Sequence, residues 1–316
     1  LESISQELDI PESKRIEAEK RYKSVGLWLN REGSLIKAYN PYIYPQGSFN
    51  LGTMIKPITD VDEYDIDLVC ELQQTKRNIT QKELKEIVGS EIINYATANN
   101  MNKQPEDNRR CWTLDYANEF HMDILPAIPD SLSFQQLLER NGFDSDYSED
   151  AIAITDKKHI YYQLISENWL GSNPKGYLKW FKYRMQIAYS LRKTRLAKAL
   201  NEDIDDIPEY KIKTPLQRTI QLLKRHRDLF FAESDFKPIS IIITTLSANY
   251  YNNEATIYES MKNILNKVQN IESYKIDGKY RILNPVNPFE NFADKWNEKS
   301  ELPEAFQEWI TAVRND

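Results

Sequence analysis

The sequence contains only two cysteines and three histidines in 316 residues. Cys70 and Cys111 both lie in strand-like runs, and we expect them to be buried free thiols, as in proteins of a reducing compartment. Together with His121, His159 and His226 they show no spacing typical of a zinc cluster. This scarcity argues against a structural zinc site.

Long apolar runs are also missing. The longest, around Ile239 to Leu246, is far too short to cross a bilayer. The sequence shows no signal peptide, internal repeat or low-complexity tract. It begins with Leu1 rather than methionine, which leaves the native start open. We expect a soluble, cytoplasmic protein without a membrane partner.

The composition is that of a globular protein, with 41% hydrophobic and 28% charged residues. The length suggests one large domain or two ordinary domains. A formal net charge of -7 argues against a general nucleic-acid coat protein, although it leaves room for a local basic groove.

The first half of the chain mixes helices with strands. Residues 11–30 predict a long amphipathic helix, and Thr80 followed by Glu83 predicts a capping box at the start of a second helix. Two strands are expected over 110–116 and 120–126, joined by a hairpin turn at 117–119. Residues 1–156 are therefore expected to form an α/β lobe.

The second half is predominantly helical in pattern. Residues 130–156 look polar and irregular, and 157–200 look helical and basic. Pro215 opens a helix whose core side is expected to carry Leu216, Ile220, Leu223 and Leu229. Further helices are expected after Pro238 and over 255–270 and 301–314. Residues 157–316 thus predict a helical C-terminal lobe, with a cleft between the two lobes.

Three acids and a Gly-Ser pair point to chemistry. Asp65 and Asp67 are two residues apart on a strand and therefore face the same side. Asp123 lies within another apolar strand, where an acid is costly unless it is paired or metal-bound. Clustered carboxylates of this kind suit Mg²⁺, which prefers oxygen ligands. Gly47-Ser48 offers backbone N–H groups and one hydroxyl to a triphosphate.

Several stretches carry a family resemblance. GSFNLGT and DEYDIDLVCEL, followed by FHMDILPAIP, resemble the DNA polymerase β-type nucleotidyltransferase superfamily. More closely, the chain is similar to the cGAS/DncV-like nucleotidyltransferases (CD-NTases) of bacterial CBASS anti-phage signalling. The resemblance extends over SNPKGYLKWF, LLKRHRDLFF, KPISIIITTLSA and NPVNPFENFADKW. It implies an α+β fold, with a mixed-sheet catalytic lobe, a helical C-terminal lobe and an active site in the cleft between them.

The resemblance also assigns roles to residues. It implies that Asp65, Asp67 and Asp123 are catalytic and bind two Mg²⁺ ions, for which Mn²⁺ substitutes. Gly47 and Ser48 are expected to contact the donor phosphates, and Lys224 and Ser240 to bind the triphosphate from the C-terminal lobe. The alternatives are a solvated helix face for Lys224 and a helix cap for Ser240. Ile241 stands where animal relatives carry a base-stacking tyrosine, so base stacking must come from elsewhere.

Two features near these residues have structural interpretations. His121 shares a strand face with Asp123, and we interpret it as a hydrogen-bonded structural histidine. Trp180, Tyr183 and Ile187 recur at helical spacing within a basic stretch, Lys175 to Lys198, and we interpret them as a core stripe. A nucleic-acid activator is therefore not expected.

The resulting hypothesis is an enzyme that joins NTPs into a cyclic di- or trinucleotide messenger and releases pyrophosphate. The product would link this enzyme, acting as a monomer, to a downstream effector in antiviral defence. Two alternatives stay open. One is a linear-product enzyme, either an oligoadenylate synthase or a tail-adding transferase. The other is a catalytically idle nucleotide-binding module of a defence complex.

Overall fold

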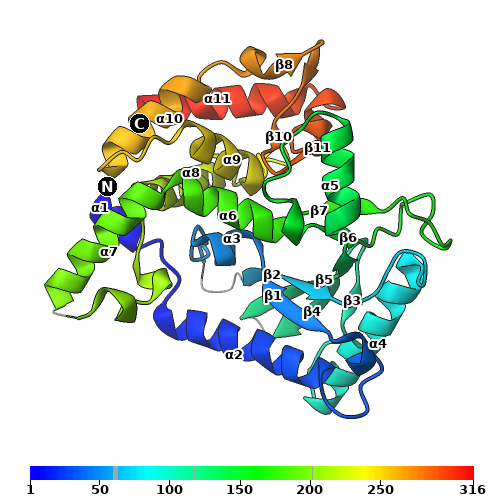
Figure 1. Ribbon diagram of the computed structural model, residues 1–316. Helices are drawn as coiled ribbons and strands as arrows, with labels where there is room; N and C mark the ends of the chain where they lie inside the picture. The colour runs from blue at the N-terminus through cyan, green and yellow to red at the C-terminus, as the bar shows by residue number, and fades with distance from the viewer. Residues whose placement is uncertain (60–62, 117–118, 201) are drawn as a thin grey trace. The chain divides into compact units, whose positions relative to one another are not determined.

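The computed structural model describes residues 1–59, 63–116, 119–200 and 202–316 (Figure 1). These residues form two compact units. The sheet unit comprises Ile10–Asn50 and Lys56–Gly176, and the helical unit comprises Leu1–Asp9, Leu51–Ile55 and Tyr177–Asp316. Each unit is described by itself below.

A seven-stranded mixed sheet forms the centre of the sheet unit. Its main path runs β1-β2-β5-β4-β3, with β6 paired to β5 and β7 paired to β6. Strands β2 and β5 are parallel, whereas the other described pairs of this sheet are antiparallel. The strand bounds are β1 Tyr42–Pro45, β2 Tyr64–Glu71, β3 Glu106–Asp107, β4 Trp112–Tyr116, β5 Phe120–Pro129, β6 Ile152–Ile154 and β7 Leu170–Ser172.

The strands near Asp65 and Asp123 are confirmed, including the antiparallel pairing of β4 with β5. The expected turn at 117–119 includes Ala117 and Asn118, which lie outside the described residues. On β2, Ile66 and Leu68 are buried, while Asp65 and Asp67 alternate with them toward the opposite face. The apolar side chains therefore anchor the strand and leave the acids on one side.

Two helices cover the apolar face of this sheet, α2 (Glu12–Leu29) and α4 (Gln81–Ala98). Thr80 and Glu83 form the expected capping box at the start of α4. Gly89 brings α4 against the sheet, because a Cβ there would lie 2.1 Å from the Trp112 ring. The Trp112 indole N–H donates to the Lys85 carbonyl at 2.9 Å, which fixes β4 on α4.

The connection after β5 differs from the sequence expectation. Residues 131–140, expected to be irregular, form α5 (Ser131–Arg140), because Phe134 and Leu138 lie one turn apart and bury against Ala151. The chain over 157–169 has turns rather than the expected helix, and a helix begins only at Pro174 with α6 (Pro174–Arg184).

The helical unit is built largely from the predicted helices. Leu216, Ile220 and Leu223 of α8 are buried as expected, but Leu229 is 59% exposed, so its assignment to the core was wrong. Gln217 and Gln221 of α8 donate to the carbonyls of Leu51 and Met54 and hold that short segment in the unit. The helices are α1 Glu2–Gln6, α7 Gln186–Leu200, α8 Pro215–Phe230, α9 Ser240–Tyr250, α10 Ile257–Val268 and α11 Glu301–Asn315, with short strands β8 Lys275–Ile276, β9 Lys279–Tyr280, β10 Leu283–Asn284 and β11 Asn287–Asn291.

The predicted core stripe on α6 and α7 is wrong for two of its three residues. Trp180 is buried, but Tyr183 and Ile187 are 58% and 57% exposed. The buried face is instead formed by Phe181, Met185 and Ala188, which lie on the other side of these helices. Among the helices that the structure describes, none is long and apolar enough to span a bilayer.

Candidate functional site

Six side chains from three neighbouring strands share the face of the sheet opposite the one on which Trp112 packs against α4. The parallel register of β2 and β5 places Asp65 beside His121 and Asp67 beside Asp123. The antiparallel register of β5 and β4 extends these pairs to Asp115 and Thr113. We call Asp67–Asp123–Thr113 the carboxylate row, and Asp65–His121–Asp115, two residues toward the start of β2, the histidine row.

The structure brings the three predicted acids together. Side chains two residues apart on a strand face the same side, and directly paired residues on neighbouring strands lie about 5 Å apart at Cβ. Asp67 and Asp123 form such a pair, and Asp65 is the next residue on that face of β2. Partial desolvation raises the pKa of the Asp65 carboxyl. His121 lowers this pKa, and the charge of Asp123 raises it further.

The Gly-Ser pair lies directly against this group. Gly47 begins the short helix α3 (Gly47–Leu51) with a φ of +61°, and a Cβ on it would lie 2.5 Å from Oδ2 of Asp67. The N–H of the preceding Gln46 donates to the Asp67 carbonyl at 2.8 Å, which holds the loop to β2. Glycine is therefore required here both by the left-handed backbone and by the close carboxylate. Ser48 follows in the first turn of α3.

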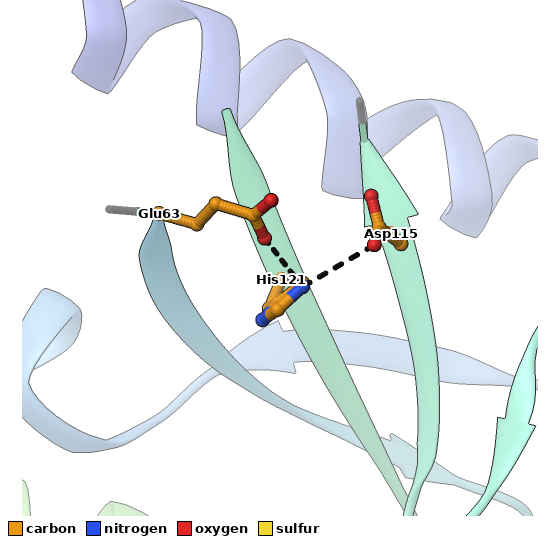
Figure 2. A group of neighbouring side chains, drawn as sticks. All are labelled: Glu63, Asp115 and His121. Carbon is orange, nitrogen blue, oxygen red and sulfur yellow. Dashed lines mark hydrogen bonds and ion pairs between the residues drawn. The ribbon is translucent and has the colours of Figure 1, made fainter. Parts of the chain in front are cut away.

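His121 is held between acids, as Figure 2 shows. Its Nε2 contacts Glu63 and lies 3.4 Å from Oδ2 of Asp115, and its Nδ1 lies 3.8 Å from Oδ1 of Asp65. Asp115 also pairs with Lys103. Burial raises the pKa of Asp115, but Lys103 and then His121 outweigh burial and keep that pKa below its usual value. The structural interpretation of His121 fits this arrangement, which also brings the ring next to Asp65.

Two side-chain groups on this face could hold a cation. Asp65, Asp67 and Asp123 offer carboxylate oxygens, the donors that Mg²⁺ prefers. Glu63, Asp115 and His121 offer ligand atoms within 4.8 Å of one another, in a mixed nitrogen and oxygen set that suits transition metals better. Oδ1 of Asp115 is buried without a hydrogen-bond partner among the described residues. Among the described residues, only the second group brings one ligand atom from each of three residues this close together, so magnesium binding by the three aspartates stays a prediction.

Sequence reasoning missed the residues that hold Asp123. The Thr113 hydroxyl donates to Oδ1 of Asp123, and the Asn108 side-chain amide donates to Oγ1 of Thr113 at 2.9 Å. Burial, followed by the charge of Asp123, raises the pKa of the nearby Cys111 thiol to about 11. The alternation of Thr113 and Asp115 on one strand was a signal, but it has meaning only once the register with β5 is known.

Lys224 and Ser240 lie in the helical unit. Lys224 is only 4% exposed, and its Nζ donates to the Thr53 carbonyl at 3.1 Å, so the alternative of a solvated helix face is wrong. Ser240 is the first residue of α9 after the N-cap Ile239, and its hydroxyl accepts from Arg227 at 2.7 Å. Their role in binding a triphosphate stays a prediction.

Comparison with known proteins gives consistent matches. Residues 41–126 match the family described as "Cyclic GMP-AMP synthase DncV-like, nucleotidyltransferase domain". This range contains Gly47, Ser48 and all three aspartates. The chain is 33% identical over 298 residues to the c-di-GMP synthase of Roseivirga ehrenbergii, covering 93% of this chain and 72% of that protein.

Solved structures share the fold. The CD-NTase CdnG of Bradyrhizobium diazoefficiens, solved in complex with GTP, matches with a TM-score of 0.72 at 21% identity and covers 98% of this chain and 88% of that one. The Vibrio cholerae di-nucleotide cyclase DncV matches with a TM-score of 0.65 at 13% identity, covering 97% of this chain and 86% of that one. At these identities the likeness concerns the fold.

Proposed function

This chain belongs to the cGAS/DncV-like nucleotidyltransferases (CD-NTases), and from that premise we propose that it joins two NTPs into a cyclic dinucleotide and releases pyrophosphate. Membership confirms the family resemblance seen in the sequence, the α+β fold with a polymerase β-like catalytic part, and the enzyme class. The cyclic product is proposed because the curated relatives are named as cyclic dinucleotide synthases.

One observation carries the proposal. Three carboxylates from two strands face the same side of the sheet, and a glycine loop lies against one of them. Ionised carboxylates at this spacing repel one another, and a bound cation would relieve that repulsion. A catalytically idle module would gain nothing that offsets the repulsion between the carboxylates, so the arrangement favours an enzyme over the idle alternative.

The proposed roles follow from position. Asp65 and Asp67 would hold two Mg²⁺ ions, and Asp123 would hold the ion nearer the acceptor. When bound, the ions would neutralise negative charge on the triphosphate and lower the pKa of the acceptor hydroxyl. Gly47 lets the loop approach Asp67 closely, and Ser48 would offer phosphate oxygens a hydroxyl and an N–H donor.

Two identical displacements would complete the reaction. The oxygen of an acceptor ribose hydroxyl attacks the α-phosphorus of a donor NTP, and the bond from that phosphorus to its bridging oxygen breaks. Pyrophosphate leaves with the electron pair, and the acceptor hydroxyl loses its proton. The linear intermediate then presents its own triphosphate to its remaining hydroxyl, and the second displacement closes the ring.

The relatives suggest which nucleotide to test first. One is named a c-di-GMP synthase and another was solved with GTP, so we propose GTP as a substrate. Lys224 and Ser240 of the helical unit are proposed to bind the donor triphosphate, with residues 1–156 as the catalytic domain and 157–316 as the closing domain. The product would act on a cytoplasmic effector in anti-phage defence.

An NTP panel tests the proposal. The purified protein is incubated with GTP alone, ATP alone and all four NTPs, each with Mg²⁺ or Mn²⁺, and products are identified by mass spectrometry after phosphatase treatment. The expected result is a phosphatase-resistant cyclic dinucleotide containing guanine, which Asp67→Asn abolishes. Phosphatase-sensitive ladders would support the linear-product alternative instead. Nucleotide binding without any product, in metal-loaded protein, would overturn the proposal.

A further inference from the structure

A chain of hydrogen bonds ends on one oxygen of Asp123. The Asn108 side-chain amide donates to Oγ1 of Thr113 at 2.9 Å, and the Thr113 hydroxyl donates to Oδ1 of Asp123. All three residues lie in the sheet unit, on the turn after β3, on β4 and on β5 respectively. Thr113 and Asp123 are direct partners across the sheet, so the contact follows from the strand register.

The direction of this chain is fixed by chemistry. An ionised carboxylate has no proton to donate, so the Thr113 hydroxyl must give its single hydrogen to Asp123. Its oxygen then accepts, which requires the amide group of Asn108, rather than its carbonyl oxygen, to face it. Each member therefore has one role, and one oxygen of Asp123, Oδ1, is occupied by the Thr113 hydroxyl.

The hairpin that carries Asn108 and Thr113 is itself anchored. Lys85, which is buried, donates to the Cys111 carbonyl at 2.8 Å and pairs with Asp107 at 3.0 Å. Lys157 pairs with the other oxygen of Asp107 at 2.6 Å. The N–H of Asn108 donates to the Cys111 carbonyl at 3.1 Å, closing the turn. Ionic contacts on both sides thus set the position of the two donors before any ligand binds.

We propose that Thr113 and Asn108 are positioning residues for the catalytic metal site: they hold Oδ1 of Asp123 and so direct its Oδ2 to the cation. This inference rests on the proposed function, because it takes Asp123 to be a metal ligand. A carboxylate with one oxygen fixed presents a single ligand atom in a single orientation, which suits the strict octahedral geometry of Mg²⁺. Neither Asn108 nor Thr113 touches substrate or metal in this scheme.

Both donors, the Thr113 hydroxyl and the Asn108 amide, are uncharged. A lysine or arginine in the place of Thr113 would hold the carboxylate as well, but its charge would repel the incoming cation. A hydroxyl orients the carboxylate without competing for its charge. A second neutral group, Asn108, then orients the hydroxyl, so no positive side chain is needed in the carboxylate row.

Metal binding gives a readout that does not depend on turnover. Mn²⁺ binding to wild type, Thr113→Val, Thr113→Ser, Asn108→Ala and Asp123→Asn is measured by the electron paramagnetic resonance of the free ion. Thr113→Val keeps the shape but removes the donor, and should weaken binding by about 10- to 100-fold, the usual range for outer residues of a metal site. Thr113→Ser should restore it to within about threefold, since it keeps the hydroxyl. Asn108→Ala should also weaken Mn²⁺ binding, but by a smaller factor than Thr113→Val.

Kinetics and stability complete the test. The kcat of Thr113→Val should fall with KM for GTP little changed, and the loss should shrink at high metal concentration. Thr97→Val is the matched control, because the Thr97 hydroxyl bonds only to the Ile93 carbonyl on the exposed side of α4; it should match wild type in metal binding and rate. Thermal unfolding of each metal-free variant excludes a loss that reflects unfolding.

The outcomes separate this inference from the proposed function. Wild-type-like Mn²⁺ binding by folded Thr113→Val, or failure of serine to rescue it, would overturn the positioning role. If wild type binds Mn²⁺ through Asp123 and Thr113→Val binds it poorly, but no NTP gives a product, the positioning role stands and the proposed function fails.

Discussion

The two rows of side chains on this sheet face differ in the groups that hold their acids. In the histidine row, Asp115 is paired with Lys103 and with His121, whose ring also contacts Glu63 and lies near Asp65. In the carboxylate row, Asp123 is held by the uncharged Thr113, and Asp67 faces Gly47. Lys103 compensates the charge of Asp115, whereas the Thr113 hydroxyl orients Asp123 without adding a positive charge. Position on the same sheet face is thus not enough to assign a function.

The largest effect should come from removing charge in the carboxylate row. Asp67→Asn should lower kcat by at least about 10³-fold, since a lost metal ligand forfeits several kcal/mol of transition-state stabilisation. The same change should leave the metal-free protein equally or more stable, because it relieves repulsion between carboxylates. Thermal unfolding with and without Mg²⁺ checks this: the ion should stabilise wild type but not the variant. A destabilised metal-free variant would contradict the view that these acids repel one another.

Next in size is the glycine that faces Asp67. Gly47→Ala should lower activity by about 10- to 100-fold and stability by about 1–2 kcal/mol, the cost of a left-handed backbone for an L-residue. Its Cβ would also displace the Asp67 carboxylate. Gly142→Ala is the control, since Gly142 has a φ of +73° with nothing near its Cβ. The control should lose stability alone; an equal loss of activity there would show that strain, and not the carboxylate, is responsible.

A change at Asp115 of the histidine row should affect stability more than activity, unlike one at Asp65 of the same row, which is a proposed metal ligand. Asp115→Asn breaks a partly buried charged pair and should cost about 1–3 kcal/mol, the usual penalty for a lost hydrogen bond to a charged group. We expect kcat to fall by less than about tenfold, because Asp115 is not proposed to bind the metal. Urea unfolding and steady-state rates on the same samples measure both effects. A loss of activity as large as that of Asp67→Asn would erase the distinction between the rows.

The smallest effect is a pH dependence confined to the histidine row. The folded pKa of Asp115 lies below its unfolded value, so its ionic contacts stabilise the protein above the unfolded pKa and are lost as pH falls through the folded one. The stability difference between wild type and Asp115→Asn should therefore be present at about pH 5 and shrink below about 4. Urea unfolding at these pH values provides the measurement, and a difference that persists undiminished at acid pH would contradict it.

The parts of the site that the sequence could predict are those set by local geometry. The two-residue spacing of Asp65 and Asp67 requires only that they lie on a strand, and an acid in the apolar strand around Asp123 stands out by its cost. The contribution of Thr113 required the residue-by-residue register of β4 against β5. Glu63 lies just before β2 and becomes a partner of His121 only through the parallel pairing of β2 with β5, which joins segments that are distant in the sequence.

The helical segments show the same limit. The capping boxes at Thr80 and Thr214 are local hydrogen-bond patterns. The sequence correctly predicted the one at Thr80. Helical spacing at Tyr183 and Ile187 was also recognised, but which face of a helix is buried depends on what packs against it. Helix α5 was missed although Leu132 and Leu137 are apolar as well, because only Phe134 and Leu138 are buried and the flanking residues are polar.

Gly89 has a consequence for the evolution of this fold. Its missing side chain admits the Trp112 ring, and Trp112 is followed directly by Thr113 on the opposite face of β4. A methyl group at position 89 would push on the ring and so tilt the residue that orients Asp123. In an alignment of relatives the two positions should therefore covary, with any side chain at 89 accompanied by a smaller residue at 112. The distance between α4 and β4 on one face of the sheet would then be conserved together with the residues that orient Asp123 on the other face.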